Sequence, residues 1–184
     1  MKIIGITEIG GLDSMYLKPD SALLVGGKPF FLPHFSEEIV CRPCLVVRIN
    51  RLGRYIEERF AYRYYDSIAL GLNMQANNLM QVPYSFNSMM RAISFDNSLA
   101  VGDWLSIEGS DQWQIGTTQS EKTYHTNDII CSINSAISEI SKYITIRMGD
   151  MVAVDFRDSA RLLQREEEWR GKRGDTDVLY CKIK

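Results

Sequence analysis

The sequence predicts one α+β domain over residues 1–184, mainly β-sheet with two or three flanking helices. Short apolar runs bounded by glycine and proline predict strands along most of the chain, whereas few stretches show helical spacing. Hydrophobic residues make up 45% of the chain and charged residues 24%, which is typical of soluble globular proteins. No internal repeat and no polar linker divides the sequence, so a single domain is expected.

The first third of the chain is expected to form strands joined by turns. Residues 22–25 and 29–33 flank Gly26-Gly27, which predicts a hairpin, and residues 44–49 are β-branched and apolar, as in a buried strand. The first predicted helix follows, and four residues share its apolar face: Ile56, Phe60, Ala61 and Tyr64.

The middle of the chain alternates predicted strands with a long polar stretch. Strands are expected over residues 68–72, 100–108, 111–118 and 151–154. Residues 73–88 are rich in Asn, Gln, Met and Ser without a period, so a loop is expected there.

A second helix is predicted over residues 129–140, where isoleucine and alanine recur at helical spacing. Thr126 or Asn127 is the expected N-cap of this helix. Residues 158–177 contain five basic and six acidic residues, which predicts a charged surface helix. An alternative for that segment is a helix that binds a partner through Leu162, Leu163 and Trp169.

Charge and cysteine content restrict the cellular role. The net charge is −2 with no basic cluster, so no nucleic-acid partner is expected. Apolar runs fall far short of the ~20 residues that cross a bilayer, and no export signal is recognised, so no membrane partner is expected. Four cysteines are too few for a disulfide scaffold, and we expect reduced thiols and a cytoplasmic location: Cys41, Cys44, Cys131 and Cys181.

Residue chemistry alone assembles no active site. Cys41-Arg42-Pro43-Cys44 is either a redox pair, half of a zinc site, or two structural thiols in a strand, and no second such pair completes a zinc site. The chain has only two histidines, His34 and His125, and it lacks a Gly-x-Ser-x-Gly motif. Glu37-Glu38 is interpreted as a solubilising pair in a turn.

A series of short motifs nevertheless follows a recognisable order: Lys18-Pro19-Asp20-Ser21-Ala22-Leu23, Pro29 to Pro33, Leu45-Val46-Val47-Arg48-Ile49, Arg63-Tyr64-Tyr65-Asp66, Gly71-Leu72-Asn73, Phe95-Asp96-Asn97-Ser98, His125-Thr126-Asn127-Asp128, Ile140 to Ile146 and Gly149-Asp150-Met151-Val152. Together they resemble the fumarylacetoacetate hydrolase family, in its 2-hydroxyhepta-2,4-diene-1,7-dioate isomerase-like branch. The resemblance covers residues 16–152 and 180–184. It implies a rolled mixed β-sandwich with flanking helices, commonly a homodimer.

The resemblance implies hydrolysis, isomerisation or decarboxylation of β-diketo and 2-oxo acids with Mg²⁺ or a similar cation. The family's metal ligands are a Glu-x-Glu pair and an Asp, and they match Arg42, Cys44 and Asn73 here. Three carboxylates have become one cation and two neutral groups. Since a close charge pair contributes ~4 kcal/mol at an effective dielectric near 20, we expect neither a metal nor another cofactor.

At further positions, too, this sequence lacks the polar or charged residues that the resemblance leads us to expect. Residues 76–80 lack the two charges and the glutamine of the family's Ala-Arg-Asp-Leu-Gln run, Ile93 stands at a lysine position, and residues 154–157 replace a Thr-Gly-Thr-Pro loop. Residues 1–17 form a shortened N-terminal segment without the family's acid/base histidine. Thr126 is retained at a position that in the family lies near substrate.

The sequence therefore predicts a degenerate family member, a pseudoenzyme that binds a small carboxylic acid or a partner. Residues expected near such a ligand are Arg42, Asn77, Asp96 and Thr126. One alternative is a metal-dependent hydrolase or isomerase in which Glu37, Glu38 or Asp96 moves into the vacated positions. Another is a redox or zinc protein that uses Cys41 and Cys44.

Overall fold

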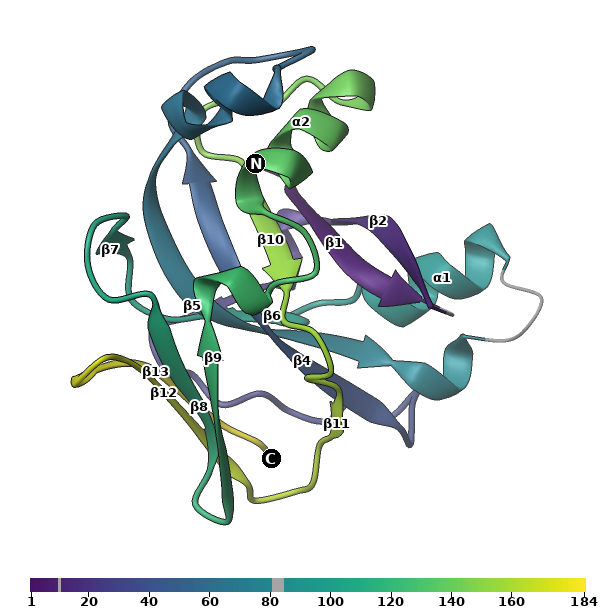
Figure 1. Cartoon of the computed structure of the whole chain (residues 1–184). Coiled ribbons are helices and arrows are strands. Elements are labelled where there is room, and N and C mark those ends of the chain that lie inside the picture. The colour runs from purple at the N-terminus through teal and green to yellow at the C-terminus, as the bar shows by residue number, and fades with distance from the viewer. Residues whose placement is uncertain (10, 81–84) are drawn as a thin grey trace.

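The computed structural model describes residues 1–9, 11–80 and 85–184, and within them the chain folds as two β-sheets flanked by helices (Figure 1). The larger sheet contains β1 (Ile3–Ile9), β2 (Leu12–Lys18), β3 (Leu23–Val25), β4 (Ile39–Ile49), β5 (Tyr65–Ala76), β6 (Leu99–Val101), β7 (Leu105–Ser106), β10 (Met151–Asp155) and β11 (Arg161–Leu162). The smaller contains β8 (Gln112–Thr117), β9 (Ser120–His125), β12 (Glu168–Arg173) and β13 (Thr176–Lys182). The predicted mainly β, mixed architecture is confirmed.

Strand β10 lies near the middle of the larger sheet, whose order is β2-β1-β10-β4-β5-β6-β3. It pairs parallel with β1 and antiparallel with β4, and β4 pairs antiparallel with β5 along its whole length. All five residues of β10 are buried, as expected for a central strand whose two faces are covered.

Serine side chains begin both α-helices. Ser85 Oγ accepts the Ser88 N–H at 3.1 Å at the start of α1 (Phe86–Ile93). Ser132 Oγ accepts the Ser135 N–H at 3.0 Å at the start of α2 (Ile133–Tyr143). Four 3₁₀ segments complete the described helices: η1 (Asp20–Ala22), η2 (Glu58–Tyr64), η3 (Asn77–Leu79) and η4 (Thr126–Asp128).

The two faces of the larger sheet are covered by different elements. One face packs against α2 and the smaller sheet in the main core, which includes Val47, Trp113 and Ile137. On the other face, Ile3 and Val46 belong to a smaller apolar cluster. The candidate site lies on this second face.

Two predicted elements are wrong in their pairing or type. Instead of forming a hairpin with residues 29–33, β3 pairs parallel with β6, and Phe30 bridges Ile183. The charged segment 158–177 forms β11, β12 and the start of β13 rather than a helix, because Trp169 and Gly171 are buried at alternate positions of β12.

Other element boundaries shift. The helix expected at residues 56–64 is the 3₁₀ segment η2, and Ser132 rather than Thr126 or Asn127 caps α2. The loop expected at 73–88 contains the end of β5, η3 and the start of α1, while its residues 81–84 lie outside the described residues.

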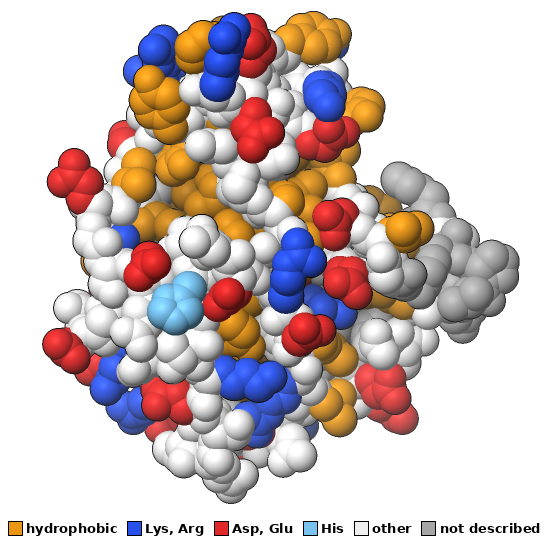
Figure 2. Space-filling view, in the orientation of Figure 1, with side chains coloured by type: hydrophobic (Ala, Val, Ile, Leu, Met, Phe, Trp, Pro, Cys, Tyr) orange, Lys and Arg blue, Asp and Glu red, His pale blue; other side chains and the backbone are white. Residues whose placement is uncertain are grey.

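Surface charges of both signs are mixed over the face shown in Figure 2, in agreement with the small net charge of −2. None of the described helices has both the length and the apolar content that crossing a membrane requires.

Candidate functional site

The three positions that the resemblance assigns to metal ligands lie side by side in the larger sheet. Arg42 of β4 is directly opposite Asn73 of β5, and Cys44 is opposite Asp155 of β10. Opposed residues of paired strands share a face, and alternate residues of one strand do too. Arg42, Cys44, Asn73 and Asp155 therefore point to the same face of the sheet.

Neighbouring strands add polar side chains to this face. Tyr16 of β2 is opposite Gly5 of β1, which is opposite Ala153, two residues before Asp155. Gln75 Nε2 donates to Thr7 Oγ1 at 3.2 Å. We call the resulting set the buried polar cluster: Thr7, Tyr16, Lys18, Arg42, Cys44, Asn73, Gln75 and Asp155. Arg42 is half-buried and the other members are buried.

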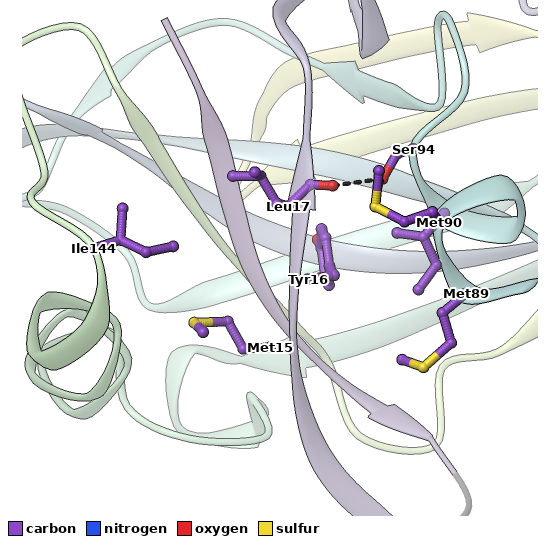
Figure 3. Close-up of a pocket in the computed structure, with 8 residues that line it drawn as sticks. Met15, Tyr16, Leu17, Met89, Met90, Ser94 and Ile144 are labelled. Atoms are coloured by element: carbon purple, nitrogen blue, oxygen red, sulfur yellow. Dashed lines mark hydrogen bonds between the residues drawn. The ribbon is translucent and has the colours of Figure 1, made fainter. Parts of the chain in front are cut away.

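Tyr16 occupies the space above β1. A Cβ atom on Gly5 would lie 2.0 Å from Tyr16 Cζ, so the phenol ring can lie against this strand only because residue 5 is glycine. Tyr16 also lines an apolar groove of about 340 Å³ with Met15, Met89 and Ile144 (Figure 3). None of the described residues that line the groove is charged, so the polar chemistry that the structure describes in this region lies in the buried polar cluster.

Lys18 is fully buried, and its ammonium group is surrounded by acceptors. Lys18 Nζ donates to the carbonyl oxygens of Met74 (3.2 Å), Ile93 (2.5 Å) and Ser98 (3.1 Å) and to Ser98 Oγ (2.8 Å). Burial lowers the pKa of Lys18 to about 7, while the charge of Asp155 raises it. Since every contact is an acceptor, the charged form is the one that this environment suits.

Asp155 is the one carboxylate of the cluster. Asn73 Nδ2 lies 3.2 Å from both Asp155 carboxylate oxygens and donates to them. Burial raises the pKa of Asp155 to about 7, and hydrogen bonds from Thr7 and Asn73 and the charges of Arg42 and Lys18 oppose this rise. Burial is the main cause, and the negative charge of Asp155 the second, that raises the pKa of both Tyr16 and Cys44. Both groups are therefore neutral near pH 7.

Several polar atoms of the cluster lack a hydrogen-bond partner among the described residues. They are the Tyr16 hydroxyl, Arg42 Nε and Asn73 Oδ1. With Lys18 and Arg42 positive and Asp155 negative, the charged members carry a formal net charge of +1 at neutral pH. Unpartnered donors and net positive charge would suit an anion.

The residues present do not fit a divalent cation. Mg²⁺ and similar ions require several oxygen ligands with balancing negative charge, but this cluster supplies one carboxylate beside two cationic side chains. Nowhere in residues 1–9, 11–80 and 85–184 do three or more His, Cys, Asp or Glu side chains form a group that could hold a metal ion.

The remaining predicted ligand residues lie elsewhere. Asn77 and Asp96 are exposed, and Asp96 accepts a hydrogen bond from Ser21 Oγ at 2.6 Å. Thr126 accepts the Trp113 indole N–H at 3.1 Å and lines a different cavity of about 240 Å³ with Tyr65. None of these three residues belongs to the buried polar cluster around Arg42, and that they bind the same ligand stays a prediction.

The positions of the side chains also do not support the two alternative predictions, a rearranged metal site and a paired-cysteine site. Glu37 and Glu38 are exposed and take no place in the cluster. Cys41 and Cys44 lie three residues apart in one strand, so their side chains point to opposite faces and belong to different apolar clusters. They cannot form a disulfide or bind one zinc ion together in this fold.

Five members of the cluster escaped the sequence analysis: Thr7, Tyr16, Lys18, Gln75 and Asp155. Lys18 stood in a motif used for the resemblance, and Asp155 directly follows the apolar run 151–154. A polar residue at the end of a buried strand, here Asp155, is the one sequence feature that could have indicated the cluster. The other four residues lie on β1, β2 and β5, and only the order of these strands in the sheet brings them next to Asp155.

Comparisons with known proteins identify relatives by sequence and by fold. The family model described as "Fumarylacetoacetate (FAA) hydrolase C-terminal" matches residues 7–176. The mitochondrial oxaloacetate tautomerase FAHD1 of Rattus norvegicus is 28% identical over 154 residues, covering 75% of this chain and 66% of the tautomerase. The human protein of the same name is 25% identical over the same length. The chain thus spans about two thirds of these relatives.

Solved structures share the fold at low identity. Fumarylpyruvate hydrolase from Pseudomonas aeruginosa, in complex with Mn²⁺ and pyruvate, has a TM-score of 0.87 at 15% identity, covering 100% of this chain and 89% of that one. For 2-hydroxyhepta-2,4-diene-1,7-dioate isomerase from Mycobacterium marinum the TM-score is 0.85 at 15% identity, with 99% and 73% covered. At these identities the similarity shows the fold alone.

Proposed function

Because this chain belongs to the fumarylacetoacetate hydrolase family, we propose that it is a member without the family's metal-dependent catalysis and that it acts as a binding or interaction protein. One observation carries the proposal. Arg42, Cys44 and Asn73 stand together at the positions assigned to the metal ligands, and Asn73 donates its amide to the cluster's own carboxylate.

Electrostatics supports this proposal. A dication among these groups would face the Arg42 guanidinium and the Lys18 ammonium, and each close like-charge pair costs ~4 kcal/mol at an effective dielectric near 20. Asp155, Asn73 and Cys44 have almost no solvent exposure. A substrate would therefore have to open the cluster before reaching them.

Metal titration of the purified chain tests the proposal. We expect that Mg²⁺ and Mn²⁺ leave the thermal unfolding temperature unchanged, and that oxaloacetate and acylpyruvates are not turned over above the buffer rate. The rat tautomerase is the positive control for the oxaloacetate assay. The variant Arg42→Glu/Cys44→Glu/Asn73→Asp tests whether restored carboxylates recover Mn²⁺ binding. Saturable Mn²⁺ binding by the unmodified chain would overturn the proposal.

A second candidate function is binding of a small carboxylic acid at Arg42. The unpartnered Arg42 Nε, the unpartnered Tyr16 hydroxyl and the net positive charge favour it. We expect oxo acids to raise the unfolding temperature of the unmodified chain and of Arg48→Met, but not of Arg42→Met. Arg48 is the matched control because it lies exposed on the same strand. Equal responses of both variants would exclude Arg42 as the binding group.

We also propose that the chain is a homodimer. Among the described strands, the terminal strand β2 is paired on one edge only and exposes Leu12, Met15 and Leu17, and such edges are usually covered in stable proteins. Sedimentation equilibrium should give twice the chain mass of 21.1 kDa. A single species of 21.1 kDa at high concentration would contradict it.

A further inference from the structure

A cavity with charged side chains in its wall lies on the opposite face of β4 from the buried polar cluster. It has a volume of about 130 Å³ and is enclosed by the β8–β9 hairpin, residues 159–161 and Trp169 of β12. Pro43 of β4 contributes to its wall. Pro43 lies between Arg42 and Cys44 in the strand, so its ring lies on the opposite face from their side chains. The sheet therefore separates this cavity from the buried polar cluster.

Trp169 supplies a donor without an acceptor. Its side chain is 2% exposed, and the buried Nε1 has no hydrogen-bond partner among the described residues. An indole N–H can only donate, and a buried donor left unpaired costs roughly 1–3 kcal/mol. In contrast, Trp113 donates its indole N–H to Thr126. Trp169 stands in the wall of the cavity, and an acceptor that came within hydrogen-bond distance of Nε1 would satisfy this donor.

Two cationic side chains from different elements line the same cavity. Arg161 Cζ lies 5.5 Å from the Trp169 ring centroid, and the guanidinium bonds Glu167 at 3.0 Å and Thr117 at 3.3 Å. Lys122 Nζ donates to the Asp158 carbonyl at 3.3 Å. A guanidinium has five N–H groups and an ammonium three, so both retain donors beyond these bonds.

The charge of the lining favours a monoanion. The Arg161 guanidinium forms an ion pair with Glu167, so their charges cancel. Of the charged lining residues, Lys122 then contributes a net charge of +1. Ser120 and Ser159 add hydroxyl groups to the wall, although Ser159 Oγ already donates to the Phe156 carbonyl at 2.6 Å. Converging N–H donors around a small space are what a carboxylate or phosphate group requires.

We propose that this cavity binds a small oxyanion, a carboxylate or an inorganic phosphate, held by Lys122, Arg161 and the Trp169 indole N–H. The site differs from the family's metal position and does not depend on the function proposed above.

Indole ¹H–¹⁵N spectra of the full chain test this site during titration with sodium acetate or sodium phosphate at constant ionic strength. We expect a saturable shift of the Trp169 signal with a Kd tighter than about 10 mM, while Trp104 and Trp113 stay in place. The Trp169→Phe and Trp104→Phe variants assign the signals. A shift with acetate alone identifies a carboxylate site, and one with phosphate alone a phosphate site.

Substitutions then locate the binding groups. Lys122→Met and Arg161→Gln should each weaken binding by roughly tenfold, equivalent to ~1.4 kcal/mol, whereas Lys28→Met and Arg48→Met should leave it unchanged. Lys122 is exposed, so its variant is expected to fold even if the Arg161 variant does not. A Trp169 signal that does not respond to either anion, or that responds equally in Lys122→Met, would overturn the proposal.

Discussion

An ammonium group buried in a sheet protein is tolerated only when its charge is fully satisfied, and Lys18 shows how this chain achieves it. Three carbonyl oxygens and one hydroxyl surround Lys18 Nζ, and Asp155 supplies a nearby negative charge. Lysine without such partners would lose its proton or unfold the site. The arrangement joins β2 to β5 and to the end of α1.

Replacing Lys18 should therefore be costly. We expect Lys18→Met to lower the free energy of unfolding by ~3 kcal/mol, because it leaves buried acceptors and the Asp155 charge uncompensated. Lys28→Met, at an exposed position, should stay within about 0.5 kcal/mol of the unmodified chain. Urea unfolding monitored by circular dichroism measures both. A Lys18→Met chain of unchanged stability would show that the ammonium contributes nothing.

Asp155 should give stability a defined pH dependence. Its pKa is about 7 in the folded chain and near its ordinary 3.8 when unfolded, so the folded state binds the extra proton between these values. The stability that Asp155 contributes is thus fully present below pH 4 and is lost as the pH rises through 7. The difference in unfolding free energy between the unmodified chain and Asp155→Asn should fall from pH 5 to pH 7.5. A constant difference would contradict the prediction.

At the level of elements, buried strands were predictable where apolar residues were contiguous. Residues 44–49 and 151–154 lie in β4 and β10 as predicted, because a continuous apolar run needs no knowledge of its partners. The charged segment 158–177 was mistaken for a helix because its strands alternate buried and exposed residues with only Trp169 and Gly171 to reveal the period. The cluster could not be predicted, since it depends on which strands become neighbours.

The start of α2 offers a direct test at this scale. Ser132→Ala should cost ~1 kcal/mol of stability, because the Ser135 N–H loses its acceptor at the N-cap. Ser138→Ala, inside the same helix, should be neutral or slightly stabilising, since alanine favours helix interiors. Thermal unfolding of the two variants gives the comparison. Equal losses would show that the Ser132 hydroxyl has no special role at the start of the helix.

Across the whole molecule, the same sheet separates two chemically different regions. One face carries the buried polar cluster, and the other carries the main core that joins the larger sheet to α2 and the smaller sheet. Arg42, Cys44 and Asn73 all lie on the first face, so changes at these positions leave the second face intact. The family fold can therefore persist without the family's site chemistry.

Because the main core spans both sheets, the chain should unfold as one cooperative unit, and its thiols can report this. Cys41 and Cys44 lie in β4 and Cys181 in β13, all buried, whereas Cys131 is half-buried. Burial raises the pKa of Cys131 and of Cys181 to about 11, so neither is a ready thiolate at neutral pH. We expect a disulfide reagent at pH 8 to label Cys131 first and the other three together, at the rate of global unfolding. In the Cys131→Ser variant, a single slow labelling phase should remain. If Cys181 were labelled well before Cys41, the smaller sheet would open independently of the larger one, contrary to this prediction.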